Sequence, residues 1–233
     1  MNYSTLDIPP MLDRRPFVGT YTILNTYGNC PHQMARRYIV KDQPYIETPE
    51  MKWGNEVHSA FEYRVGSSKP LPDTMRQWEH FAQPFDGQFA KVEQKLGISA
   101  EGKCVGYWDG SCWFRGKADL AIIRGETAYI NDWKTGKSSY EDPFELETNA
   151  VLIHAKYPQL KKIVGSYTWL RENRVSQMYD LSDTRSTWNE ICRLMGEIIA
   201  LKKTGQFEKK KSGLCGWCSV DDCENYFISD KRK

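Results

Sequence analysis

The feature that most constrains the fold of this chain is a pair of apolar segments between Gly116 and Lys137, each interrupted by one carboxylate. The first segment reads ADLAII and the second reads YIND, with a glycine between them. Short runs rich in β-branched and aromatic residues, separated by turns, are typical of antiparallel strands. A further such run, EGKCVGYWDG, precedes the pair. The sequence therefore predicts a β-meander over residues 101–137.

The predicted hairpin brings three polar side chains together. With a two-residue turn at Arg124-Gly125, Asp119 becomes a diagonal neighbour of Asp132, about 7 Å away. Alternation of side chains then places Asp119, Asp132 and Lys134 on one face, whereas a three-residue turn would move Asp119 to the other face. Two carboxylates beside an ammonium suit phosphodiester hydrolysis, because hard oxygen ligands bind Mg²⁺ or Mn²⁺.

The alternative interpretation is an exposed hairpin with ordinary surface charges. Against it, Asp119 and Asp132 lie inside apolar segments. A buried charge in such a position is costly unless it has a partner, and a bound metal ion is such a partner.

Helical patterns flank the predicted strands. A second strand pair is expected at 162–170 and 175–181. The last helix is capped by Ser182 or Asp183 and ended by Gly205. Helices are predicted at 20–40, 51–65, 74–96, 143–156 and 184–203, after an irregular arm at 1–19. This order predicts an α/β fold with a central mixed sheet flanked by helices and a small cysteine-bearing appendage.

The cysteines are unevenly placed. The segment GLCGWCSVDDC carries Cys215, Cys218 and Cys223 in a C-x2-C-x4-C pattern, and Cys30 stands far away before a proline. Three thiols so close together predict a centre for a soft metal, with Cys30 as the candidate fourth ligand. Zinc, an iron–sulfur cluster and packing without metal are the alternatives that the spacing leaves open.

Charge and hydropathy limit the class of protein only loosely. The chain has 32 basic and 30 acidic residues, a balance that neither requires nor excludes nucleic acid as a partner. A basic cluster, Lys202, Lys203 and Lys209–Lys211, suits non-specific contacts to phosphates, and Trp53, Trp113 and Trp133 are candidates for stacking on unpaired bases. No segment approaches the roughly 20 apolar residues of a membrane span, and the N-terminus does not resemble a secretory signal. We therefore expect a cytoplasmic protein with no membrane partner.

The segments GKADLAII and INDWKTGK together resemble the PD-(D/E)xK nuclease superfamily. The likeness is to its RecB-like branch, which includes CRISPR-associated four-cysteine, AddB-type and phage exonucleases. In that pattern Asp119 matches the first acidic position, Asp132 the second and Lys134 the lysine. Ala118 stands where the namesake proline would be. The resemblance implies a restriction-endonuclease-like core and a Mg²⁺- or Mn²⁺-dependent deoxyribonuclease of a bacterial or phage-infected cell.

The same resemblance implies further site residues. The segment WGNEVH matches the G-x-x-x-H helix of the family, so His58 is expected to bind the metal, assisted by the backbone carbonyl of Trp133. Glu62, one helical turn beyond His58, is a weaker candidate for a supporting role.

The helix after the hairpin departs from the family pattern. Glu145 and Asn149 stand where the family has the glutamine and tyrosine of a Q-x-x-x-Y motif that positions DNA and the lysine. The departure puts DNA positioning by this helix in doubt, because an acidic residue repels phosphate unless it reaches the metal or Lys134.

One cysteine near the start and three near the end resemble the iron–sulfur staple of this branch. The resemblance implies a structural [4Fe–4S] cluster on Cys30, Cys215, Cys218 and Cys223, with zinc as the alternative. We expect a single nuclease domain over 1–233, with an arm and helix carrying Cys30 (1–50), a nuclease core (51–205) and a Cys-rich iron–sulfur tail (206–233).

The expected function is a DNA exonuclease that acts on free ends without sequence preference, in DNA recombination and repair or in phage DNA processing. A recombination or repair protein is a possible partner. The alternatives are a structure-specific endonuclease and a catalytically silent iron–sulfur subunit that binds DNA.

Overall fold

The protein is described from a computed structural model that covers residues 3–5, 16–43 and 47–227. The chain divides into two compact units. The larger unit is Glu47–Asn189, and the smaller unit combines Met1–Ile46 with Glu190–Lys233. The predicted hairpin belongs to the larger unit, and the four candidate cysteine ligands belong to the smaller one.

A seven-stranded mixed sheet forms the centre of the larger unit, in the order β3-β2-β4-β5-β6-β7, with β8 also paired to β6. Its neighbouring strands are antiparallel except β5 and β6, which run parallel. A parallel pair needs a crossover connection, and helix α6 provides it. The strands are β2 (Ala90–Ser99), β3 (Cys104–Val105), β4 (Cys112–Arg124), β5 (Thr127–Lys134), β6 (Lys162–Trp169), β7 (Arg174–Val175) and β8 (Tyr179–Asp180).

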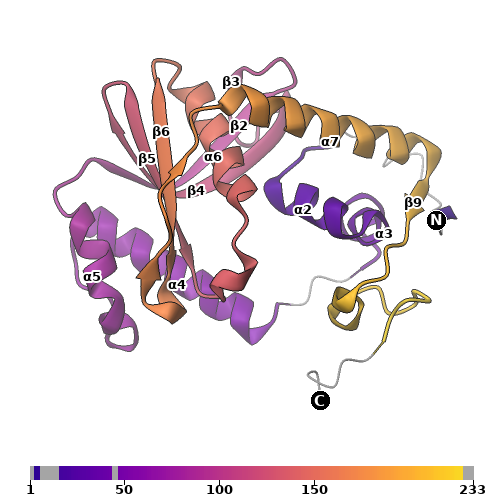
Figure 1. The fold of residues 1–233 in the computed structure, drawn as a ribbon, viewed down its shortest axis with the longest axis horizontal. Coiled ribbons are helices and arrows are strands. Elements are labelled where there is room, and N and C mark those ends of the chain that lie inside the picture. Colours follow the sequence, from indigo (N-terminus) through magenta and orange to yellow (C-terminus); the bar gives the residue numbers. More distant parts are fainter. Residues whose placement is uncertain (1–2, 6–15, 44–46, 228–233) are drawn as a thin grey trace. The chain divides into compact units, whose positions relative to one another are not determined.

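Helices flank this sheet (Figure 1). Helix α4 (Pro49–Ser67) and helix α5 (Glu79–Ala82) pack against it through one hydrophobic cluster, and helix α6 (Pro143–Lys156) lies on the other side. The short 3₁₀ helix η2 (Asp73–Trp78) precedes α5. The cluster fixes α4 against the strands that carry the predicted carboxylates.

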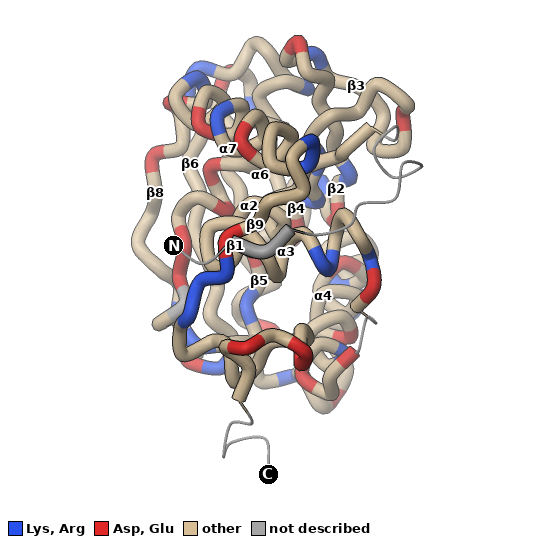
Figure 2. The backbone as a smooth tube through the Cα atoms, turned by 90° about the vertical axis from the view of Figure 1, so that its right-hand side faces the viewer, with Lys and Arg blue, Asp and Glu red and all other residues tan. Residues whose placement is uncertain are grey.

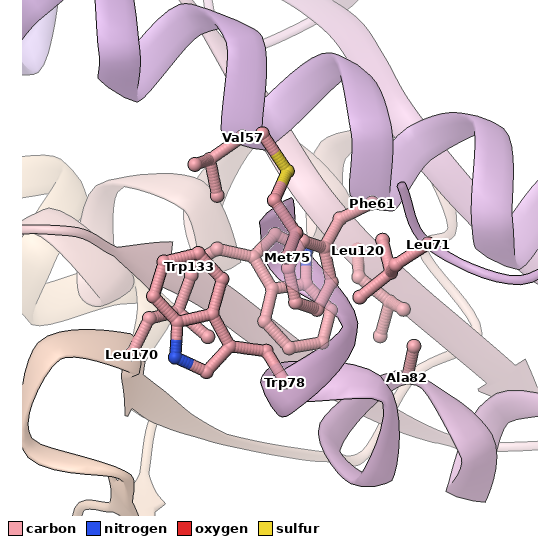
Figure 3. Packing of buried hydrophobic residues seen from close by; sticks show 9 residues of the cluster. All are labelled: Val57, Phe61, Leu71, Met75, Trp78, Ala82, Leu120, Trp133 and Leu170. Carbon is pink, nitrogen blue, oxygen red and sulfur yellow. The ribbon is translucent and has the colours of Figure 1, made fainter. Parts of the chain in front are cut away.

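Figure 3 shows this cluster from close by. Phe61 of α4 and Trp133 of β5 lie at its centre, with ring centroids 4.4 Å apart. Both side chains are almost fully buried. Burial of aromatic side chains on this scale stabilises a fold by several kcal/mol, about 3–5 kcal/mol for each truncation to alanine. The nine members are Val57, Phe61, Leu71, Met75, Trp78, Ala82, Leu120, Trp133 and Leu170.

The smaller unit is built from short elements. Helix α2 is followed directly by α3, and the break between them falls at Cys30-Pro31, because proline lacks the N–H donor and disfavours helical geometry in the residue before it. Strands β1 and β9 form an antiparallel pair. The elements are β1 (Tyr3–Thr5), α2 (Tyr21–Asn29), α3 (Pro31–Met34), the π-helix η1 (Ala35–Val40), the end of α7 (Thr184–Thr204), β9 (Gln206–Glu208) and η6 (Gly213–Trp217).

The predicted α/β class with a central mixed sheet flanked by helices is confirmed. The helix predicted over 143–156 has the observed bounds of α6, and Asp183 caps α7 by accepting a hydrogen bond from the Ser186 N–H at 3.0 Å. None of the described helices is long and apolar enough to cross a membrane.

Four predictions of local structure were wrong. Residues 90–96 belong to strand β2 rather than to a helix, because pairing with β4 outweighs the helix propensity of AKVEQKL. The helix predicted over 20–40 is interrupted at Cys30, and the predicted run 101–110 contributes only the two-residue β3. Residues 1–2 and 6–15 of the predicted irregular arm lie outside the described part of the chain, and Tyr3–Thr5 form strand β1 because they pair with β9.

Candidate metal centre

The hairpin of β4 and β5 places two carboxylates level with each other. Its ladder runs from Arg124↔Thr127 to Leu120↔Asn131, and the next pair in the same register is Asp119 and Asp132. The predicted turn was wrong by one residue. Gly125 takes the first central position of the turn, with a φ of 58° that glycine adopts without strain, as in a type II′ turn. Because this change moves the pairing by two residues, it preserves which side chains share a face.

Asp119 is held at the point where the ladder ends. Its Oδ2 accepts a hydrogen bond from the Trp133 N–H at 3.0 Å, and the side chain is buried. The same oxygen lies 3.2 Å from Nδ1 of His58. Asp119 therefore contacts His58 of α4, and one of its oxygens is shared between a backbone donor and the imidazole.

His58 reaches the sheet because α4 is anchored on both sides of it. Thr48 caps the helix start, and Val57 and Phe61 are fully buried against the sheet. A Cβ atom on Gly54, one turn before His58, would lie 3.5 Å from Thr135 Oγ1, so the helix passes close to the end of β5. The structure thus brings the helical histidine to the hairpin, as the G-x-x-x-H pattern led us to expect.

Glu93 completes a cluster that the sequence did not predict. Its Oε1 lies 3.6 Å from His58 Nδ1. Ligand atoms of His58, Glu93 and Asp119 all lie within 4.8 Å of one another, close enough to hold one metal ion. Glu93 has a φ of 48°, an uncommon backbone conformation for a residue other than glycine, and the pairs on either side of it align it with Asp119. Lys117 forms an ion pair with the other oxygen of Glu93.

The charges of this cluster set the protonation of His58. Burial lowers its pKa, but the close carboxylates of Asp119 and Glu93 and the nearby charge of Asp132 outweigh burial and raise the pKa to about 10. The surroundings of the imidazole therefore favour a positive charge at this position. A divalent cation bound by the same oxygens would satisfy that preference.

Asp132 is also buried, and burial raises its pKa well above the usual range; Lys134 opposes this rise, while Asp119 and Glu145 add to it. Lys134 Nζ lies 3.0 Å from Asp132 Oδ1. This contact is an ion pair without hydrogen-bond geometry, so the buried Oδ1 of Asp132 has no hydrogen-bond donor among the described residues. A buried oxygen without a donor fits a metal ligand.

Lys134 is held by Glu145, the first residue at which α6 departs from the family pattern. Glu145 Oε2 accepts a hydrogen bond from Lys134 Nζ at 2.7 Å. Burial lowers the pKa of Lys134, but Asp132 and Glu145 outweigh it, and the pKa lies above its ordinary value. The acidic side chain therefore reaches the lysine, which is one of the two conditions under which it would not repel phosphate.

Among the described residues, neither Glu62 nor Asn149 is part of the cluster that could hold a metal ion. Asn149 is buried in α6, and its Oδ1 would lie 3.2 Å from a Cβ on Gly116 of β4. Glu62 is exposed on α4, and its charge helps to raise the pKa of Lys117 after the larger contribution of Glu93. Trp133 contributes its N–H to Asp119, and the role of its carbonyl stays a prediction.

In the smaller unit, the four candidate cysteines line one pocket. Amide N–H groups of Ser212 and Val220 donate hydrogen bonds to sulfur atoms at 3.4 Å, and such bonds stabilise thiolates that bind metal. Burial raises the pKa of Cys218, and the charges of the other three cysteines add to this effect. The four are Cys30, Cys215, Cys218 and Cys223.

The candidate DNA-contacting residues have different environments. Trp133 is buried in the core, so its predicted stacking on bases was wrong, and Trp113 packs edge-on against Trp188 at 5.6 Å. Trp53 remains partly exposed, at 36%. In the basic cluster Lys202 is buried, whereas the run Lys209–Lys211 follows β9 as a continuous basic stretch (Figure 2).

Comparison with known proteins adds a family and two similar folds. The model of the PD-(D/E)XK nuclease superfamily matches residues 73–223. No curated protein matches the sequence. The crystal structure of SSO0001 aligns with a TM-score of 0.51 and 17% identity, covering 92% of this chain and 89% of that one. A “Putative exonuclease” from Eubacterium rectale aligns with a TM-score of 0.55 and 11% identity, covering 96% of this chain and 97% of that one.

Proposed function

The chain belongs to the PD-(D/E)XK nuclease superfamily, and from that premise we propose that it is a Mg²⁺- or Mn²⁺-dependent DNA exonuclease of the RecB-like type. Its mixed sheet flanked by helices is consistent with the restriction-endonuclease-like core of that superfamily, whose nucleases use divalent metal ions. The observation that carries the proposal is the convergence of His58, Glu93 and Asp119 within 4.8 Å.

In this proposal His58, Glu93, Asp119 and Asp132 hold the cation. The buried Oδ1 of Asp132, which lacks a hydrogen-bond donor, supports its assignment as a ligand. The Trp133 carbonyl is a further candidate ligand. When bound, a divalent cation lowers the pKa of water and offsets negative charge on the phosphate.

Lys134 supplies a fixed positive charge beside the cation. Its raised pKa keeps the ammonium protonated, which suits it to hold the scissile phosphate and to orient the attacking water. Glu145 fixes the ammonium through the 2.7 Å hydrogen bond, and the ion pair offsets the charge of Glu145 itself. Glu145 is therefore a positioning residue in this mechanism, while Glu62 and Asn149 keep only weak supporting roles.

We further propose that the four cysteines hold a [4Fe–4S] cluster with a structural role. All four line one pocket and two of them accept amide hydrogen bonds, which fits thiolate ligation. Zinc is the alternative, because Cys₄ sites bind both. Iron and zinc analysis of protein purified without oxygen distinguishes them: about four iron atoms per chain supports the cluster, and stoichiometric zinc contradicts it.

The proposed substrate is DNA with free ends, in recombination, repair or phage DNA processing, with a recombination or repair protein as a candidate partner. The fold shared with a “Putative exonuclease” supports an end-dependent mode. Linear end-labelled DNA and covalently closed circular DNA separate this mode from the endonuclease alternative. Degradation of linear DNA alone is expected, and equally fast nicking of circles would contradict the exonuclease assignment.

The test of the centre compares the wild type with Asp132→Ala and Lys134→Ala in Mn²⁺, Mg²⁺ and EDTA. Cleavage is expected only in the wild type and only with a metal. The matched controls Asp73→Ala and Lys161→Ala remove the same charges from side chains that are 96% and 74% exposed, and they should keep wild-type activity. Cleavage by either centre variant, with its fold verified by circular dichroism, would contradict the proposal. Absence of cleavage in the wild type would favour the silent DNA-binding alternative.

A further inference from the structure

A groove of about 720 Å³ lies at one edge of the sheet in the larger unit. This volume falls within the range of about 300–1,000 Å³ that is typical of ligand sites. Its lining includes two tryptophans, one arginine and several amide or hydroxyl side chains. The lining residues are Glu50, Trp53, Gln77, Trp78, Thr135, Gly136, Leu170, Arg171 and Asn173.

The groove begins where the candidate metal centre ends. Strand β5 finishes at Lys134 and continues directly into Thr135, which lines the groove. Thr135 Oγ1 would lie 3.5 Å from a Cβ on Gly54, one helical turn before His58. Strand β6 runs parallel to β5 and ends level with it, so Arg171 extends from the same edge of the sheet. The groove therefore lies directly beyond the end of the strand that carries Asp132 and Lys134.

An exposed indole borders this groove. Trp53 is 36% exposed, and its ring is tilted by 52° to that of Trp78, with centroids 6.3 Å apart. The two rings are thus not stacked flat on each other, and Trp78 packs into the core cluster (Figure 3) while Trp53 remains at the surface. Stacking of a nucleic-acid base on such a ring contributes about 1–3 kcal/mol.

Charge in the groove favours a phosphate on one side. Arg171 is exposed and makes no ion pair with the described residues. A guanidinium without a carboxylate partner suits a phosphate, which it can bind through two parallel hydrogen bonds. The lining also includes one carboxylate, Glu50, in the first turn of α4. Hydrogen bonds to its own backbone and to Thr48 lower its pKa, so it stays ionised and the phosphate is expected on the Arg171 side of the groove.

We propose that this groove binds an unpaired nucleotide of the DNA strand next to the scissile phosphate, with its base against Trp53 and its phosphate on Arg171. A base inside a duplex is already stacked on both faces, so an indole can stack only on a base that has left the helix. The substrate class is therefore single-stranded DNA or a frayed end. The inference rests on the proposed nuclease function and specifies the form of DNA that the centre accepts.

The test measures binding without cleavage. Fluorescence anisotropy with an end-labelled single-stranded oligonucleotide and a blunt duplex, both in EDTA, compares the wild type with Trp53→Ala, Trp53→Phe and Arg171→Gln. Trp53→Ala is expected to weaken binding of the single strand by about 5- to 150-fold. Trp53→Phe should restore most of that loss, and Arg171→Gln should lower the dependence of log K on log salt by about one unit.

Trp108→Ala is the matched control, because Trp108 is 75% exposed but does not line the groove. It should bind both DNAs as the wild type does. Unchanged single-strand affinity in Trp53→Ala, or an equal loss for the duplex and the single strand, would overturn the proposal. If Trp53→Ala does not fold, an unchanged salt dependence in Arg171→Gln would overturn it instead.

Failure of this inference is distinguishable from failure of the nuclease proposal. If the protein cleaves DNA but its Trp53 variants bind DNA normally, the metal-centre proposal is supported and the groove proposal is contradicted. If the protein binds single strands through Trp53 but cleaves no DNA, the groove proposal is supported and the nuclease proposal is contradicted.

Discussion

Replacing Asp132 with asparagine is expected to abolish cleavage and, at the same time, to stabilise the metal-free protein. The side chain is only 8% exposed, and one of its oxygens accepts no hydrogen bond. Burial and the neighbouring carboxylates raise its pKa, so its ionised form costs folding free energy at neutral pH. A raised folded-state pKa gives stability below the unfolded pKa and loses it as pH rises, which is why the neutral isostere is favoured.

The size of the effect follows from two opposing contributions. Asparagine removes the desolvation cost of a buried charge, but Lys134 loses one of its two carboxylate partners while keeping Glu145 at 2.7 Å. Replacing both members of a buried ion pair by neutral groups is often neutral or stabilising by about 1–4 kcal/mol, whereas removing one member usually destabilises because it leaves the other charge without a partner. Here Lys134 keeps Glu145 as its partner, so we expect a net stabilisation of about 1–2 kcal/mol. For a chain of this length that corresponds to an increase in Tm of about 2–8 °C.

The assay is thermal unfolding of wild type and Asp132→Asn, first in EDTA and then in excess Mn²⁺. The variant should have the higher Tm in EDTA. Metal at about 100 times its Kd stabilises a binding-competent protein by about 2.7 kcal/mol, so the order should reverse in Mn²⁺. Asp86→Asn is the control of opposite sign, because hydrogen bonds from Arg64 lower the pKa of Asp86, and its neutralisation should destabilise at neutral pH.

A metal-free Asp132→Asn protein that is clearly less stable than the wild type would refute this reasoning. It would show that the ion pair of Asp132 with Lys134 stabilises the metal-free fold, whereas our account has the buried charge of Asp132 destabilise it. Equal stabilisation of both proteins by Mn²⁺ would refute the assignment of Asp132 as a ligand.

Three further predictions concern single contacts. Glu145→Ala should lower kcat about 10- to 100-fold by releasing Lys134, whereas Glu145→Gln, which keeps an oxygen acceptor, should lose less, as measured by steady-state cleavage of DNA. Tyr27, whose hydroxyl donates to Glu197 at 3.1 Å, has a pKa raised to about 12, first by burial and then by Glu197. Tyr27→Phe should therefore cost about 1 kcal/mol in denaturant titrations below pH 10, and that difference should vanish as pH rises through 12. Cys218→Ser should abolish iron binding, as measured by metal analysis. It should also lower the unfolding temperature in a thermal scan.

Specific results would contradict each of these three predictions. Equal activity of both Glu145 variants and the wild type would remove this residue from the positioning of the lysine. A constant difference between Tyr27→Phe and the wild type across alkaline pH would show that the hydroxyl does not titrate as described. Cys192→Ser, in α7 and outside the cysteine pocket, should retain iron, and iron retained by Cys218→Ser would contradict its assignment as a ligand.

The two aspartates of the metal centre could be predicted from the sequence because each is a charged residue inside an apolar segment. Asp119 and Asp132 stand in apolar strands, and the predicted common face tolerates the wrong turn because the pairing shifted by two residues. Helix α6 is predicted to its ends because proline begins it and the apolar pattern is regular. The cysteine spacing likewise indicates a shared pocket, which the structure shows.

Glu93 was missed because its role depends on tertiary structure. Its segment consists of good helix formers, and only pairing with β4 makes it a strand. Its left-handed backbone and its position level with Asp119 follow from that pairing and leave no local sequence signal. The groove beside Trp53 is equally non-local, because its lining comes from α4, η2 and the ends of β5 and β6.

The most direct measurement of the central claim is anomalous X-ray diffraction from a crystal of the protein soaked in Mn²⁺. The account predicts one strong anomalous peak about 2 Å from the nearest nitrogen of His58 and from oxygens of Glu93, Asp119 and Asp132, with Lys134 beside it. A crystal that binds no manganese among these side chains, or that shows Asp119 and Asp132 pointing to opposite faces of the sheet, would contradict the account.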